Sequence, residues 1–397
     1  MRVQTLPIFL TFLLMGVADA MGPLSDAVKT QYQISNVVAT LLSFFVFIAF
    51  AVFSVPGGVL SARIGKKKLL LLGLGLNALA LLAPSVMEPD FALLLACIFL
   101  LGIGTTFLQV AGNPIMRDVS AEGNYSRNLS FAQGIKGIGS TASTYLVTTL
   151  ASITLFKSMG WRGSFPLFFI LMVIAFVAVA VLKLKETKAN KPPGIGGSLV
   201  LLGQPVFAFA VLGIFLYVGA EASMGRFLFP FMKDLDMAHG ATEQEAIKTA
   251  SKFGPALFFG LLTVGRLLGG FVLMVMSPRA CLRLSAVLGL LGGAALLTGS
   301  QPLAIAGVLV AGLGFANIWP MLFSITVEER PERANELSGL MCMAISGGAL
   351  IPLLMGRLVD LNWGAMAFLV PVGCFIYLLV LSLKGGKKAV VPAPTKA

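Results

Sequence analysis

The chain has 397 residues, of which 57% are hydrophobic and only 12% charged, and its mean hydropathy is +0.93. A soluble domain carries about a quarter charged residues, so this composition excludes a soluble enzyme, a disordered chain and a disulfide-rich secreted module. The net charge of +12 indicates basic loops at one membrane face rather than a nucleic-acid partner. Because a spanning helix takes about 20 residues, the sequence predicts an all-α membrane protein with twelve transmembrane helices.

The apolar runs fall into two groups of six. We expect the first group at 6–28, 36–61, 69–87, 91–118, 128–155 and 163–183. We expect the second group at 203–233, 250–276, 280–299, 302–328, 335–359 and 363–383. A charged, proline-stopped segment lies between them and cannot remain in hydrocarbon. The sequence therefore predicts two pseudo-symmetric six-helix bundles, at 1–183 and 203–397, joined by a cytoplasmic linker at 184–202.

The orientation follows from the basic residues. With the N-terminus inside, most loop lysines and arginines fall in the cytoplasm, including those of the 63–68 loop, the linker and the C-terminal tail. Arg2 and Ala18-Asp19-Ala20 imitate a signal peptide, but the central Asp and the many later spans favour an uncleaved first helix. Both termini are predicted to be cytoplasmic.

The sequence offers no candidate residues for a metal site or for a catalytic nucleophile. The four cysteines, Cys97, Cys281, Cys342 and Cys374, each stand alone in an apolar run, and His239 is the single histidine. We expect the cysteines to pack as small apolar residues. The sequence predicts no metal site, no cofactor and no enzymatic activity.

Five charged residues stand out inside the predicted spans, away from their ends: Asp19, Lys136, Glu221, Arg226 and Arg266. A charge at the bilayer centre costs about 2.5–3.5 kcal/mol on insertion scales. Because the two negative and three positive charges nearly cancel, we expect them to pair with one another in a wet interior rather than face lipid.

Asp19 lies near the middle of the first span, beside Gly16, Gly22 and Pro23. A carboxylate at that depth can bind and release a proton or a cation as water access changes sides. The alternative is a structural Asp that caps a helix break or pairs with a lysine. We favour ion coupling.

Amide side chains share helix faces in spans 4 and 5. Gln109 and Asn113 are four residues apart, and Gln133 and Lys136 are three apart. Amides both donate and accept hydrogen bonds, which suits the hydroxyls of a sugar. Hydrogen bonding between packed helices explains such pairs equally well.

The second half offers fewer candidates. Glu221 and Arg226 are five residues apart and do not face each other, so Arg226 either snorkels outward or serves the site. Arg266 lies nearer the cytoplasmic end of its span and is expected to be structural. Asn317 is a candidate sugar ligand, and Trp319 either stacks on a sugar or packs at a helix break.

Several motifs resemble a known family. The loop from Gly58 to Lys68 resembles the signature loop of the major facilitator superfamily, except that Ala62 replaces its usual Asp. Five further stretches resemble the fucose/glucose/galactose symporter family, and they span nearly the whole chain: 108–114, 126–140, 217–221, 315–320 and 339–352. The missing Asp at Ala62 weakens the expected charge lock between loop and helix in this half.

The resemblance implies a cation-coupled monosaccharide importer of a bacterial inner membrane, working by alternating access. It places the coupling role on Asp19 and a sugar-binding role on Gln133. Gln109 stands where fucose transporters have Glu, which favours a glucose/galactose-type hexose. Lys136 replaces an Asn of the fucose branch and Arg226 a small residue, so an anionic sugar, such as a sialic or uronic acid, remains an alternative.

Other functions are compatible with the composition. A drug or lipid exporter of the same superfamily would fit, although its usual Gly-Pro-x-x-Gly-Gly run is absent from span 5, and a channel is a further alternative. We expect a monomer that binds a small sugar within the lipid bilayer, with Gln109, Asn113, Gln133, Lys136, Glu221, Asn317 and Trp319 as its ligands. The coupling ion is H⁺ or Na⁺.

Overall fold

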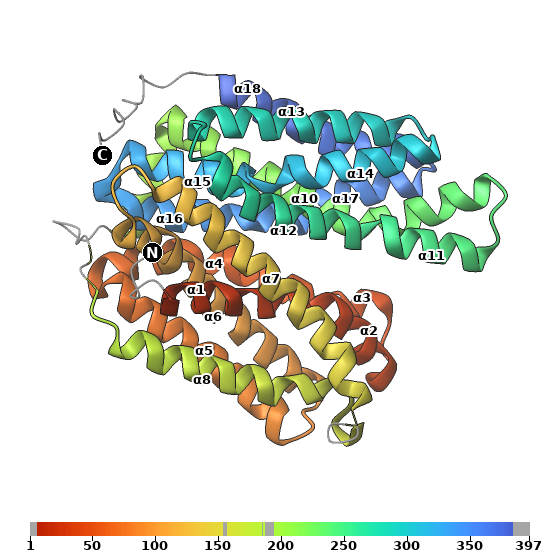
Figure 1. Ribbon diagram of the computed structural model, residues 1–397. Coiled ribbons are helices and arrows are strands. Elements are labelled where there is room, and N and C mark those ends of the chain that lie inside the picture. The colour runs from red at the N-terminus through yellow and green to blue at the C-terminus, as the bar shows by residue number, and fades with distance from the viewer. Residues whose placement is uncertain (1–5, 154–156, 185, 187–193, 384–397) are drawn as a thin grey trace.

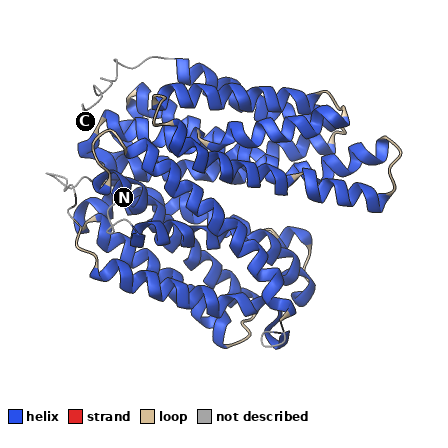
Figure 2. Cartoon of the chain, in the orientation of Figure 1, coloured by secondary structure: helices blue, strands red, loops and turns tan. Residues whose placement is uncertain are grey.

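The computed structural model describes residues 6–153, 157–184, 186 and 194–383. Within this part of the chain the protein consists of helices and loops (Figure 2). The helices of the first half are α1 (Leu6–Met15), the 3₁₀ segment η2 (Gly16–Ala20), α2 (Met21–Tyr32), α3 (Asn36–Ala39), α4 (Leu41–Ile64), α5 (Lys66–Val86), α6 (Phe91–Val119), α7 (Tyr125–Ser152), η3 (Lys157–Ser164) and α8 (Phe165–Val181).

The second half begins after the linker. Its helices are α9 (Ile195–Leu199), η4 (Val200–Gly203), α10 (Pro205–Ala238), α11 (Glu243–Phe253), α12 (Pro255–Val272), α13 (Pro278–Leu297), α14 (Gln301–Ala316), α15 (Ile318–Glu329), η5 (Pro331–Arg333), α16 (Ala334–Met343), η6 (Ala344–Ser346), α17 (Gly347–Asp360), η7 (Gly364–Phe368) and α18 (Leu369–Leu383). Of the predicted linker, residues 185 and 187–193 lie outside the described residues, as do 384–397 of the predicted tail.

The predicted membrane architecture is confirmed. Ten helical stretches of the described chain are long and apolar enough to cross a membrane. The α1–α2 pair, whose apolar part is Leu6–Asp19, and the more polar α7 complete the twelve. In lipid every backbone N–H and C=O must find a partner inside the protein, which is why these apolar runs are helical.

Three of the predicted spans are interrupted near their middle. The first narrows to the 3₁₀ segment η2 at Asp19, as the nearby small residues suggested. The span predicted at 302–328 breaks at Asn317, between α14 and α15, and the one at 335–359 breaks at η6. Such breaks expose backbone groups and polar side chains, so they are tolerated only where protein or water surrounds them.

The span predicted at 203–233 extends further in the structure. Helix α10 runs for 34 residues, about 51 Å at 1.5 Å per residue, whereas a bilayer core is about 30 Å thick. The helix therefore projects beyond the hydrocarbon and is followed by the amphipathic α11, which packs back against it (Figure 1). Hydropathy did not predict this hairpin because its residues are polar.

Small residues bring neighbouring helices into close contact in both halves. A Cβ on Gly73 of α5 would lie 2.8 Å from the Gly104 carbonyl oxygen of α6. In the second half, a Cβ on Gly314 of α14 would lie 2.2 Å from the Gly289 nitrogen of α13. Since lipid supplies no hydrophobic drive between helices, such close packing is what holds membrane bundles together.

The two halves touch at one end of the molecule, which we call the linker end because the last turn of α8 and the α4–α5 turn lie there (Figure 1). Side-chain hydrogen bonds join the halves at this end. Ser126 and Ser324 have their Oγ atoms 2.8 Å apart, and Ser61 Oγ lies 3.3 Å from Asn335 Oδ1. Ser338 Oγ also donates to the Val110 carbonyl oxygen at 2.8 Å.

The halves separate toward the opposite end, which we call the α11 end. At mid-depth α7 packs against α12, where a Cβ on Gly137 would lie 2.5 Å from Thr263 Oγ1. Toward the α11 end the two bundles diverge (Figure 1), and Ile138 and Tyr145 of α7 are 45% and 63% exposed. The interface therefore closes at the linker end and opens at the α11 end.

The signature loop after α4 makes the turn at Gly65, whose φ of +95° favours glycine. Without an Asp at position 62, a buried ion pair holds this region together within the first half. Lys66 Nζ lies 2.5 Å from Asp118 Oδ2, and Glu186 accepts hydrogen bonds from the Lys66 and Lys67 backbone nitrogens. Toward the second half the loop region makes the neutral Ser61–Asn335 contact.

Candidate functional site

Asp19 lies on η2, at the break in the first span, and its side chain is 49% exposed despite this mid-span position. The end of α1 and the start of η2 lie close against α7. A Cβ on Gly16 of η2 would lie 2.3 Å from the Ser140 nitrogen, and one on Gly139 of α7 would lie 1.9 Å from the carbonyl oxygen of Leu13 in α1. Ser143 Oγ donates to the Gly16 carbonyl oxygen at 3.0 Å. The two backbones thus fix the carboxylate relative to α7.

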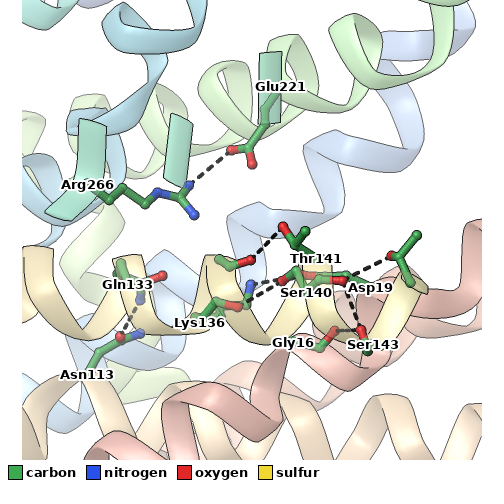
Figure 3. A network of polar contacts seen from close by, with 12 residues as sticks. Gly16, Asp19, Asn113, Gln133, Lys136, Ser140, Thr141, Ser143, Glu221 and Arg266 are labelled. Carbon is green, nitrogen blue, oxygen red and sulfur yellow. Dashed lines mark hydrogen bonds and ion pairs between the residues drawn. The ribbon is translucent and has the colours of Figure 1, made fainter. Parts of the chain in front are cut away.

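Two residues of α7, one helical turn apart, point their side chains toward this carboxylate (Figure 3). Ser140 Oγ donates to Asp19 Oδ2 at 2.6 Å, and Lys136 Nζ lies 3.7 Å from the same oxygen. The Lys136 side chain is 17% exposed. The sequence suggested that Asp19 and Lys136 pair, and the structure brings them together. Ser140 was missed, because a serine in a span carries no charge signal.

A second ion pair lies across the interface, in the other half. Glu221 on α10 faces Arg266 on α12, with 3.6 Å between Oε2 and Nη2 (Figure 3). Arg266 Nη2 also donates to the Tyr217 hydroxyl at 3.1 Å, and its Nε donates to the Ala316 carbonyl oxygen at 3.2 Å. The arginine is buried while the Glu221 side chain is 21% exposed. The partner of Glu221 is therefore Arg266, a residue of a neighbouring helix for which the sequence predicted only a structural role.

The two ion pairs belong to one electrostatic unit. Arg266 interacts electrostatically with Asp19 of the first half as well as with Glu221. Together Asp19, Lys136, Glu221 and Arg266 carry no net charge, which keeps four ionised groups tolerable between the bundles. Each half supplies one carboxylate and one cation.

The amide residues form a buried layer beside the first ion pair. Gln133 Nε2 donates to Asn113 Oδ1 at 3.0 Å, and Asn113 Nδ2 points to Cys342 Sγ of the second half at 3.9 Å. Gln109 is also buried. Asn113 thus faces the second half, and Gln133 lies about one turn closer to the linker end than Lys136 (Figure 3).

Asn317 and Trp319 lie at the break between α14 and α15. The Asn317 amide donates to the Gly265 carbonyl oxygen at 2.9 Å, and its Oδ1 lies 2.7 Å from Ser130 Oγ of the first half. The Trp319 ring packs on Phe323 at 5.7 Å between centroids, and its buried Nε1 has no hydrogen-bond acceptor among the described residues. Asn317 thus joins the halves in this conformation.

Arg226 lies apart from both ion pairs. Its side chain is exposed on α10, and its Cζ lies 5.9 Å from the centre of the Phe227 ring. Among the described residues no group of three or more His, Cys, Asp or Glu side chains could hold a metal ion. The side chains of this site can therefore form ion pairs, bind a proton and form hydrogen bonds at the plane between the two bundles.

A polar site between two helical bundles that part at one end and close at the other defines a secondary membrane transporter. The model of the Major Facilitator Superfamily matches residues 8–352, and the chain belongs to this family. Its members are transporters and not enzymes.

Curated relatives cover most of the chain. A glucose/galactose transporter of Brucella abortus is 28% identical over 374 residues, covering 90% of this chain and 88% of its own. A putative glucose/galactose transporter of Helicobacter pylori is 27% identical, with 95% of each chain covered. An L-fucose-proton symporter of Haemophilus influenzae is 22% identical, again with 95% of each chain covered.

Solved structures agree in fold. The fucose:proton symporter of E. coli, in a structure of its outward conformation, matches with a TM-score of 0.79 at 18% identity, covering 96% of this chain and 99% of that one. A proton:xylose symporter matches with a TM-score of 0.72 at 13% identity, covering 95% of this chain and 94% of that one.

Proposed function

We propose that the protein imports a neutral hexose of the glucose/galactose type together with a proton, by alternating access. Two kinds of observation support this proposal. Relatives aligned over 90% or more of the chain are named glucose/galactose transporters, and others are named L-fucose-proton symporters. The site itself combines a titratable carboxylate with amides suited to sugar hydroxyls.

The half-exposed carboxylate of Asp19 carries the proposal. In the described conformation its side chain is 49% exposed, while hydrogen bonds join the halves at the linker end. A proton on Asp19 would neutralise it and free Lys136, which in turn changes the balance of charge between the halves. Proton binding and sugar binding then each alter the affinity for the other by the same free energy.

The proton suits this site better than sodium. The Lys136 ammonium lies 3.7 Å from Asp19 Oδ2. The ammonium lowers the affinity of this oxygen for any cation. A proton, however, needs only this one oxygen, whereas a sodium ion needs several oxygen ligands at once.

The sugar is assigned to the plane between the halves. Gln109, Asn113, Gln133 and Asn317 would bind hydroxyls. Asn113, Gln133 and Asn317 would exchange their present inter-helix hydrogen bonds for bonds to the sugar. Trp319, whose indole N–H lacks a partner among the described residues, would supply a donor or an apolar face. Lys136 of the first half and Glu221 of the second half would lie at the two edges of the site.

The proposed setting is the cytoplasmic membrane of a bacterium, with the linker end and both termini in the cytoplasm. The basic residues gathered near the linker end support this orientation through the positive-inside rule. The protein is proposed to work as a monomer, since each chain carries both halves of the site.

Uptake into vesicles tests the function. Radiolabelled D-glucose and D-galactose should accumulate under an inward proton gradient and not under a sodium gradient of equal size. Asp19→Asn should abolish accumulation yet retain exchange of sugar down its own gradient, because the coupling group is lost while the amides remain. Undiminished accumulation by Asp19→Asn would exclude the proposed coupling role.

A second candidate function is import of an anionic sugar. The observation in its favour is the 3.7 Å separation of Lys136 from Asp19, which leaves the ammonium able to turn toward a substrate carboxylate. Lys136→Asn discriminates between the candidates. Under proton–hexose symport the pH dependence of uptake changes with substrate choice unchanged, whereas under the second candidate the preference shifts from sugar acids toward neutral sugars.

A further inference from the structure

Ser140 lies where α7 meets the break in the first span, and its hydroxyl has two partners. One is Asp19 Oδ2, at 2.6 Å, and the other is the Lys136 carbonyl oxygen one turn back on α7, at 3.0 Å. A hydroxyl has one proton to donate, so it can serve only one of these acceptors at a time.

We propose that Ser140 is a positioning residue that sets how readily Asp19 takes up and releases the coupling proton. While the carboxylate is ionised, the Ser140 hydroxyl donates to it and stabilises the charged form. When a proton sits on Oδ2, that O–H donates to Ser140 Oγ instead, and the hydroxyl turns to the Lys136 carbonyl oxygen. Ser140 thus satisfies both protonation states without any change in the backbone.

The surrounding backbone makes this arrangement specific to Ser140. Gly16 and Gly139 bring η2 and α7 so close that a Cβ at either would collide with the opposite backbone. Ser143, three residues further along α7, donates to the Gly16 carbonyl oxygen and not to Asp19. The two serines therefore share one junction, but only Ser140 contacts the titrating group.

The charged side chains that act on Asp19 come from α7 and α12. On α7 the ammonium of Lys136 faces it, and on α12 the guanidinium of Arg266 interacts with it while pairing with Glu221. The titratable residues of α6 lie toward the ends of that helix. On α2 the nearest carboxyl is Asp26, whose side chain lies outside the described part of the chain.

The inference rests on the proposed function and is tested by the pH dependence of hexose uptake. Uptake of a hexose that enters together with a proton should fall as external pH rises. Ser140→Ala removes a donor to the carboxylate, so the proton binds more readily and the half-maximal pH should move upward by about half to one unit. Ser140→Thr keeps the hydroxyl and should keep the wild-type value.

Two further variants guard against a merely structural effect. Ser140→Cys retains the size but donates weakly, so its half-maximal pH should also move upward, by less than that of Ser140→Ala. Ser143→Ala weakens the same junction without touching Asp19, and should lower the uptake rate at most, with the half-maximal pH unchanged.

The outcomes separate the inference from the proposed function. If Asp19→Asn abolishes accumulation while Ser140→Ala and Ser140→Cys keep the wild-type half-maximal pH, the coupling role stands and the role of Ser140 is refuted. An equal shift in Ser143→Ala would refute it too, because the effect would then belong to the junction. If Asp19→Asn still accumulates sugar, the coupling role of Asp19 and the role of Ser140 are both refuted.

Discussion

At the scale of single residues, the site contains four ionised side chains whose charges compensate one another. Arg266 is the most constrained, since it is buried and bonds to Tyr217, Glu221 and the Ala316 carbonyl oxygen. Removing one member of such a pair leaves the other charge without compensation, whereas removing both is often tolerated.

We therefore predict strong coupling between Glu221 and Arg266 in stability. Arg266→Gln alone should cost about 3–5 kcal/mol, and Glu221→Gln alone should cost less, because its side chain is partly exposed. Thermal unfolding in detergent should show that the double variant loses clearly less than the sum of the single ones. Additive losses would mean that the two side chains do not stabilise each other.

Single residues also differ in how far their roles can be predicted from the sequence. The charges of Asp19, Lys136 and Glu221 inside apolar spans identify these residues from the sequence alone, because burial of charge is costly. The partner of Glu221 could not be predicted, since it comes from a different helix, far along the chain. Ser140 and Ser130 were missed because neutral hydroxyls occur throughout membrane helices without functional meaning.

At the scale of helices, glycine decides how closely elements approach. Hydropathy predicted the twelve spans, but the contacts at Gly16 and Gly139 depend on three-dimensional packing, and the breaks at Asn317 and η6 depend on polar groups satisfied by neighbours. The polar α11 hairpin was invisible to a search for apolar runs.

Gly139→Ala should disrupt the junction that carries the coupling site. Its Cβ would lie 1.9 Å from the Leu13 carbonyl oxygen, so a backbone must move. We expect a loss of at least about 1–3 kcal/mol, measured as lowered thermal stability together with lost accumulation. Gly373→Ala on α18 is the matched control, since nothing lies within 4 Å of its added Cβ. Wild-type stability of Gly139→Ala would contradict the described packing.

The exposed helix α11 should respond to acid. Hydrogen bonds from the Thr242 hydroxyl and backbone N–H hold the pKa of Glu245 below its usual value of 4.5. A depressed folded-state pKa gives stability that is present above the unfolded value and lost as pH falls. The protection factors of the amide hydrogens in the first turn of α11, corrected for the intrinsic exchange rate at each pH, should accordingly fall as pH falls below about 4.5, and Glu245→Gln should remove this dependence.

At the scale of the whole molecule, the two halves meet through serine and asparagine side chains at the linker end and separate at the α11 end. These neutral contacts are individually weak, which suits an interface that must open and close during transport. The charged Lys66–Asp118 pair, in contrast, lies within one half and need not break.

A disulfide across this interface should trap the described conformation. Ser126 and Ser324 have Oγ atoms 2.8 Å apart, so Ser126→Cys combined with Ser324→Cys should oxidise readily. Oxidation should stop uptake and reduction should restore it, while each single variant transports in both conditions. The native cysteines are buried and should not interfere. Undiminished uptake by the fully oxidised double variant would show that these ends need not part.

The most direct test of proton–sugar coupling through Asp19 is sugar-driven proton movement in proteoliposomes without any imposed gradient. Adding D-galactose outside should make the external medium more alkaline as sugar and protons enter together, and Asp19→Asn should abolish this signal while sugar still equilibrates. Sugar entry by the wild-type protein with no proton movement, or an undiminished signal in Asp19→Asn, would contradict the account.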